Sequence, residues 1–176
     1  MKKRYFTSVL LLMGLLLCYL SAAPEMLTFG WHLTHGQRQT FATYSIPVPL
    51  DWTGTFDDSG RWFSIDKAQG PVRIFLFGPS GASIGFSSTP MPRPGTEIVG
   101  DFAKSPPPDY GTVITSIRQI ADFNSSCEQH TVKVLPKMVY IQCFPNGTSG
   151  IEVHFAGDSQ HVPEFFAILD GVKKTN

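Results

Sequence analysis

Residues 127–155 decide the fold of this chain: CEQHTVKVLPKMVYIQCFPNGTSGIEVHF. Apolar and polar residues alternate in three runs within it, at 127–134, 138–144 and 151–155. Because side chains one residue apart point to opposite faces of a strand, each run is typical of a strand with one buried and one polar face. The prolines and the Asn-Gly pair between the runs favour turns. The stretch therefore predicts a three-stranded antiparallel meander.

The two cysteines of this stretch, Cys127 and Cys143, lie symmetrically about Leu135-Pro136. If a hairpin turns there, they stand directly opposite each other, near enough to form a disulfide. A redox-active or nucleophilic thiol is the alternative, but the chain has no C-x-x-C pair. We therefore predict a structural disulfide between Cys127 and Cys143.

The polar face of the same meander is the candidate chemical site. The hairpin register places His130 opposite Tyr140, and a second turn at 145–149 brings the third strand beside them. We expect two rows of side chains on this face, His130-Tyr140-His154 and Glu128-Gln142-Glu152. Imidazoles next to carboxylates could bind a metal or act as an acid–base pair. The histidines would stand roughly 10 Å apart, two strands away from each other. That separation favours the simpler interpretation, a solvated sheet face.

The rest of the chain adds strands and one terminal helix. Further strands are expected at 40–46, 61–65, 72–77, 82–88 and 112–121. A helix is expected from about 162 to 174, because Phe165, Ile168, Leu169 and Val172 follow helical spacing. The pattern predicts an α+β fold: a mainly antiparallel sheet of about seven or eight strands with the C-terminal helix packed on one face.

Two segments are expected to lie outside this regular structure. Residues 24–39, with His32 and His35, read as an irregular surface loop. Residues 89–111 form a proline-rich surface segment in which 96–104 are compatible with a short helix. Trp52 and Trp62 adjoin strand boundaries and are expected in the core.

The N-terminus resembles an export signal. Lys2, Lys3 and Arg4 precede an apolar run at 9–20, and small residues follow at 21–23. This order is typical of a signal peptide cleaved after Ala22 or Ala23. Two alternatives remain: an uncleaved anchor over residues 5–23, which could cross a bilayer, or a lipoprotein at Cys18. We expect a secreted or periplasmic domain at 24–176, or a single-pass anchored protein with that domain outside the cytoplasm.

The charge composition limits the classes of partner that we expect. Without Lys2, Lys3 and Arg4, the chain holds 11 basic against 14 acidic residues, a formal charge of −3. With no basic stripe, nucleic acid is not an expected partner. Apart from an uncleaved signal segment, nothing predicts membrane binding.

Other motifs are weaker. The G-P-S-G stretch at 78–81 reads as a hairpin turn, and Asp57-Asp58 reads as turn sequence rather than a calcium loop. Asn124 and Asn146 begin glycosylation sequons.

Two short segments resemble a known family. The segment YSIPVPLDW at 44–52, and a strand to Phe155 followed by a helix from Pro163 to Val172, are similar to the two ends of Mog1/PsbP-like domains. The resemblance implies an antiparallel sheet flanked by helices and a non-catalytic role in docking to a partner or a membrane-bound complex.

These observations favour an exported, non-enzymatic binding or accessory module without a cofactor or metal. Its partner would be an exported or membrane-bound protein, held by Met91, Phe102 and Tyr110 of the proline-rich segment. One alternative is a metal-binding protein or enzyme that uses His130, Tyr140, His154 and Glu152. Another is a membrane-anchored structural protein.

Overall fold

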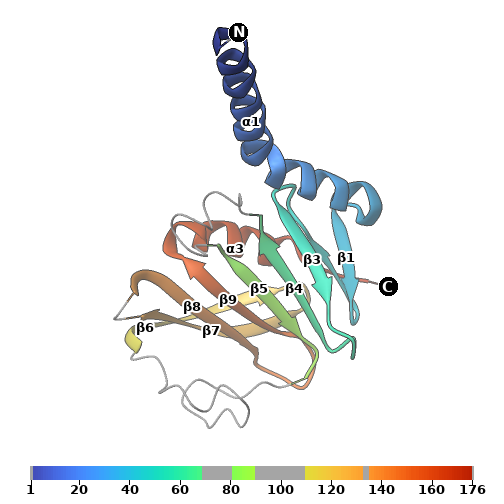
Figure 1. The fold of residues 1–176 in the computed structure, drawn as a ribbon. Coiled ribbons are helices and arrows are strands. Elements are labelled where there is room, and N and C mark those ends of the chain that lie inside the picture. The colour runs from blue at the N-terminus through green and yellow to red at the C-terminus, as the bar shows by residue number, and fades with distance from the viewer. Residues whose placement is uncertain (1, 69–80, 90–109, 133–134, 176) are drawn as a thin grey trace.

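A computed structural model describes residues 2–68, 81–89, 110–132 and 135–175, and shows two antiparallel sheets with helices at both ends (Figure 1). The larger sheet has seven strands in the order β3-β4-β5-β9-β8-β7-β6, and the smaller has the order β1-β2-β10. The predicted α+β class with a mainly antiparallel sheet is therefore confirmed.

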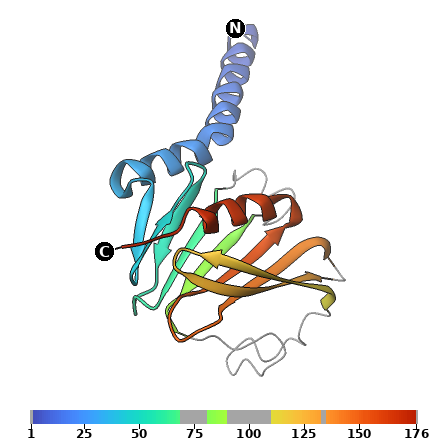
Figure 2. The same cartoon turned by 180° about the vertical axis from the view of Figure 1, so that it is seen from behind.

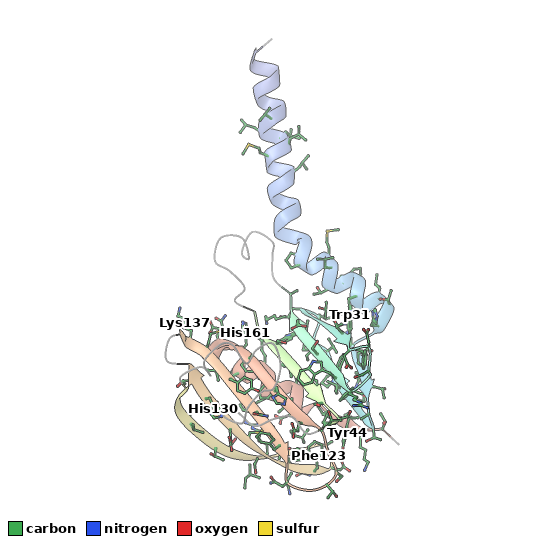
Figure 3. All side chains as sticks on the ribbon, turned by 60° about the horizontal axis from the view of Figure 1, so that its bottom comes forward. Trp31, Tyr44, Phe123, His130, Lys137 and His161 are labelled. Atoms are coloured by element: carbon green, nitrogen blue, oxygen red, sulfur yellow. A yellow bond between two sulfur atoms is a disulfide. The ribbon has the colours of Figure 1, made fainter. Side chains whose placement is uncertain are left out.

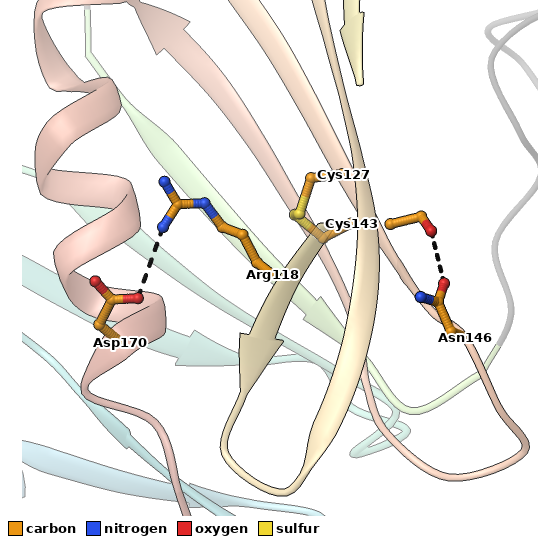
Figure 4. Close-up of a disulfide and its surroundings, with 6 residues drawn as sticks. Arg118, Cys127, Cys143, Asn146 and Asp170 are labelled. Carbon is orange, nitrogen blue, oxygen red and sulfur yellow. Dashed lines mark hydrogen bonds and ion pairs between the residues drawn. A yellow bond between two sulfur atoms is a disulfide. The ribbon is translucent and has the colours of Figure 1, made fainter. Parts of the chain in front are cut away.

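The meander of residues 127–155 forms as predicted, in strands β7 (Phe123–Val132), β8 (Leu135–Pro145) and β9 (Glu152–Asp158). Cys127 pairs with Cys143, and the two form a disulfide (Figure 4). Strand β6 (Tyr110–Ile120) lies beside β7 at one edge of the sheet. The register, and with it the predicted disulfide, is confirmed for the first hairpin.

The other half of the large sheet comes from earlier in the chain. Strands β4 (Trp62–Lys67) and β5 (Ser83–Ser87) correspond to two predicted strands, and β5 pairs with β9. Strand β3 (Trp52–Phe56) was missed, since its sequence TGT has no apolar alternation. The strand expected at 72–77, the helix expected at 96–104 and most of the segment 89–111 lie outside the described residues.

The single strand expected at 40–46 is wrong. The chain instead makes a hairpin from β1 (Arg38–Phe41) to β2 (Tyr44–Pro47). Ala42 turns the chain there with a φ of 51°, a left-handed conformation that its sequence neighbours do not signal.

The C-terminal helix packs on one face of the large sheet (Figure 2). It begins with the short turn η2 (Ser159–His161), and α3 (Val162–Asp170) buries Phe165, Ile168 and Leu169. Arg118 of β6 lies over the Phe166 ring, 3.6 Å from its centroid. The helix therefore covers the core face of the sheet, as predicted.

The predicted end of this helix at 174 is wrong. Helix α3 ends at Asp170 with Gly171 as its C-cap residue, because the chain beyond it pairs with β2: Lys173–Lys174 form the short strand β10. Lys174 donates to the Asp122 carboxylate at 2.7 Å.

The segment expected to be irregular at 24–39 is helical instead. Helix α1 runs from Lys2 to His35, and it bends where Pro24 lies within it (Figure 1). Within the described part of the chain, no helix is long and apolar enough to span a membrane. Gly30 does not end the helix, because the last turns of α1 are stabilised by contacts with the sheet.

The expected surface loop around His32 is accordingly a docked helix end. The His32 ring nitrogens lie 2.8 Å from the Gly36 carbonyl oxygen and 2.9 Å from that of Pro49. Trp31 donates its indole N–H to the Gly54 carbonyl of β3 at 3.1 Å. His35 is exposed and stacks on Trp31.

Candidate functional site

The predicted polar face exists, on the side of the large sheet away from α3. His130 stands opposite Tyr140, as the hairpin register predicted. The second register differs from the prediction by two residues: Gln142 pairs with His154, and Tyr140 pairs with Ala156. A shift of two residues leaves every side chain on its face, because the strand period is two. The face was therefore right, whereas the rows across it were not.

The centre of this face is buried, which corrects the expectation of a solvated surface. The polar side chains concerned are those of His130, Gln142, Glu152 and His154. One large covering side chain is Trp62 of β4, whose ring centroid is 5.7 Å from that of His154. Trp62 is thus half-buried on the polar face rather than in the core, where Trp52 does lie. The pairing of β4 with β5 decides on which face of the sheet Trp62 lies, and the sequence pattern does not reveal this pairing.

His154 is the most perturbed of these groups. The Tyr140 hydroxyl lies 2.8 Å from its Nδ1, and Glu152 Oε2 lies 3.7 Å from its Nε2. Burial lowers the pKa of His154 from 6.5 to about 4, because the charged imidazolium loses its water. The ring is therefore neutral at neutral pH, and a hydrogen bond joins its Nδ1 to the Tyr140 hydroxyl.

His130 and Glu128 form a second contact, with 3.7 Å between Nε2 and Oε2. They sit on β7, while His154 is two strands away on β9. Across the residues that the structure describes, no three His, Cys, Asp or Glu side chains gather closely enough to hold a metal ion. The predicted site residues are thus brought onto one face but divided into two pairs.

Gln142 lies between these pairs, on the face where the sequence predicted it in the row with Glu128 and Glu152. It is 0% exposed, and neither atom of its side-chain amide has a hydrogen-bond partner among the described residues. A buried amide without hydrogen-bond partners is costly, so Gln142 lowers the stability of the fold.

A hollow of about 590 Å³ opens on the same face where the β8–β9 loop overhangs β6 and β7. Its lining combines hydroxyl, amide and carboxylate groups with one aromatic ring, from Thr115, Ser126, Glu128, Phe144, Asn146 and Thr148 among others. Ser126 donates to the Asn146 side chain at 2.6 Å, as the dashed line in Figure 4 shows. The two sequons therefore meet at this hollow. His130, labelled in Figure 3, lies on β7 of the same sheet.

The most exposed apolar residues of the large sheet lie on β6. Val113 is 50% exposed, Ile114 55% and Ile117 74%. Among the described strands, β6 ends the sheet and pairs only with β7. A long edge strand with exposed apolar side chains offers unpaired backbone groups and an apolar surface to another chain.

The opposite edge of the sheet is protected. Strand β3 is only five residues long, and α1 packs against it through the Trp31 bond to Gly54. Short edge strands and covering helices are common ways to prevent pairing with another chain. Among the described residues the two edges of this sheet therefore differ: α1 packs against β3, while no described strand pairs with the outer edge of β6.

Of the predicted partner residues, Met91 and Phe102 lie outside the described residues, and Tyr110 is the first residue of β6. The sequence predicted a strand at 112–121 but not its place at the edge. Residues 110–117 contain no charged side chain, so the charge that commonly marks an edge strand was missing as a signal.

Comparisons of the chain with protein-family models, curated proteins and solved structures find no match. The resemblance to Mog1/PsbP-like domains therefore stays a prediction.

Proposed function

We propose that this protein is a non-enzymatic binding module that works outside the cytoplasm and holds a protein partner along strand β6. The observation that carries this proposal is the open β6 edge, where Val113, Ile114 and Ile117 are exposed on an uncharged stretch. Such an edge can accept an added strand, whose backbone hydrogen bonds give affinity and whose side chains give specificity.

The extracytoplasmic location is supported by two observations. The Cys127–Cys143 disulfide fits an oxidising compartment, where such bonds form and persist. The basic and apolar order of residues 2–23 is that of an export signal.

The acid–base alternative on the polar face has less support. Its best element is the contact chain from Tyr140 through His154 to Glu152. An imidazole with a pKa of about 4 is a weak base, and a general base works best with a pKa near the operating pH. Burial therefore suits His154 to stabilising the sheet better than to moving protons.

Site-specific photocrosslinking in the native host tests the proposal. A photoreactive amino acid at Ile117 should give covalent adducts of defined mass. The matched control is position 55, where Thr55 is also exposed, on the same face but at the opposite edge of the sheet. Adducts from 117 and none from 55 are expected. Equal adducts at both positions, or none at 117, would contradict a binding role for β6.

A further inference from the structure

We infer that the partner of the β6 edge is a second copy of this chain, paired antiparallel through β6 about a two-fold axis at Thr115. This inference rests on the proposed function and names its partner. It follows from three features of β6: its open edge, its lack of available charge and the symmetry of its sequence.

The charge pattern of β6 permits self-pairing. Residues 110–117 carry no ionisable side chain other than the tyrosine at 110. The first charged residue, Arg118, is engaged within its own molecule by the Phe166 ring and by Asp170, at 3.7 Å. Natural edge strands commonly carry a charge that repels a second copy. No such charge stands on the exposed stretch of β6.

The symmetry argument selects the axis. In an antiparallel pair about a two-fold axis perpendicular to the sheet, residues that face each other sum to a constant even number. With the axis at Thr115, Val113 of each copy stands opposite Ile117 of the other. Both are exposed and on the same face, so two apolar pairs form at once.

The neighbouring axes are poorer. An axis at Ile114 places Val113 opposite threonine 115, and an axis at Ser116 places Ile117 opposite that same threonine. An axis at Val113 or at Ile117 pairs that residue with its own copy, which is one apolar pair, whereas the axis at Thr115 forms two apolar pairs on the polar face. The resulting interface is isologous, because each copy contributes the same surface.

This pairing also places the two hollows together. Thr115 lines the hollow of its own copy, and it would stand at the axis opposite Thr115 of the second copy. The dimer would thus bring both hollows to the same place on one continuous sheet.

Cysteine cross-linking of the full chain tests the axis directly. In a Cys18→Ser background, Thr115→Cys should form a disulfide-linked dimer, because opposed Cβ atoms on paired strands lie about 4.5–5.5 Å apart. Ile117→Cys is the matched control, because the two copies of residue 117 would be roughly 13 Å apart along the strands. The readout is dimer on a non-reducing gel, with the internal disulfide confirmed by peptide mass mapping. Absence of dimer at 115 in a chain that keeps the internal disulfide, or equal yields at both positions, would overturn the inference.

Charge exchange tests the pairing of 113 with 117. Ile117→Lys should raise the dissociation constant of the dimer roughly tenfold, since it affects two symmetric pairs. Adding Val113→Glu should restore dimerisation, because each new lysine then faces a glutamate. Adding Val113→Lys instead should not restore it, and Thr55→Lys should have no effect. If both double variants behave alike, the register is wrong.

The outcomes separate this inference from the proposed function. Photocrosslinks from 117 to a different protein, with no cysteine-linked dimer at 115, would leave the binding role standing and overturn self-pairing. Absence of both would overturn both.

Discussion

His154 is held neutral by its surroundings, and this should make stability depend on pH. The folded-state pKa of about 4 lies below the ordinary value of 6.5. Between those values the unfolded chain binds a proton that the folded chain excludes. Stability from this residue is therefore complete above pH 6.5 and falls as the pH drops toward 4, by up to about 3 kcal/mol.

Urea unfolding at a series of pH values checks this prediction. His154→Gln should flatten the pH dependence between 6.5 and 4, since glutamine does not titrate. The absolute stability of the variant at pH 7 is not the test, because the Tyr140 bond is also lost. Identical slopes in the variant and the natural chain would show that another group accounts for the dependence.

Gly85 shows how closely the polar face is packed. A Cβ atom built at Gly85 would lie 1.9 Å from Cζ2 of Trp62. The Trp62 ring therefore occupies the space that any side chain at position 85 would need. We expect Gly85→Ala to destabilise the fold by about 1–3 kcal/mol, because it forces the Trp62 ring from its place.

A double-mutant cycle separates this clash from other effects of the alanine. In a Trp62→Leu background, the smaller side chain leaves room, and Gly85→Ala should cost less than in the natural chain. Thermal or urea unfolding of the four proteins gives the coupling. Additive losses would mean that the tryptophan ring is not the obstacle.

At the scale of elements, the meander depends on its disulfide. Cys127 and Cys143 are both buried, and they lie 16 positions apart in the sequence. Closing a loop of this size restricts the unfolded chain and stabilises the fold by about 3 kcal/mol in the chain-entropy model. We expect Cys127→Ala with Cys143→Ala to lower the free energy of unfolding by about that amount.

The measurement is urea unfolding of the double variant against the natural chain without reductant. Reductant is the control: it should destabilise the natural chain and leave the double variant unchanged. A natural chain that is insensitive to complete reduction would contradict a stabilising role for this bond.

At the scale of the whole molecule, the last turns of α1 close one edge of the sheet. Trp31 bonds to the backbone carbonyl of Gly54. The His32 ring bonds to the backbone carbonyls of Gly36 and Pro49. We expect Trp31→Ala with His32→Ala to release this part of the helix without unfolding the large sheet. Local opening has a lower free energy than global unfolding.

Hydrogen exchange followed by mass spectrometry checks this prediction. Peptides covering 28–35 and β3 should exchange faster in the double variant, while those of β7 and β8 should keep their protection. His35→Ala on the exposed side of α1 is the matched control and should leave β3 protected. Faster exchange throughout the sheet would show that α1 supports the whole fold.

The position of the polar face and the first hairpin could be predicted because they depend on local properties. Alternation with a period of two assigns the faces of β7, β8 and β9, and the turn at Leu135-Pro136 sets the pairing of Cys127 with Cys143. A slip of two residues between β8 and β9 did not change the face of His154. The C-terminal helix and its apolar residues were likewise local features.

The sequence by itself thus determined the fold class, the meander, the disulfide and the face on which each polar residue stands. Only the tertiary structure decided that β9 lies between β8 and β5, that Trp62 covers His154, and that β6 is an open edge while α1 closes β3. The physical reason is that strand order and burial depend on contacts between residues distant in sequence. Strand periodicity records which side of a strand is apolar, but not which strand or helix will lie beside it.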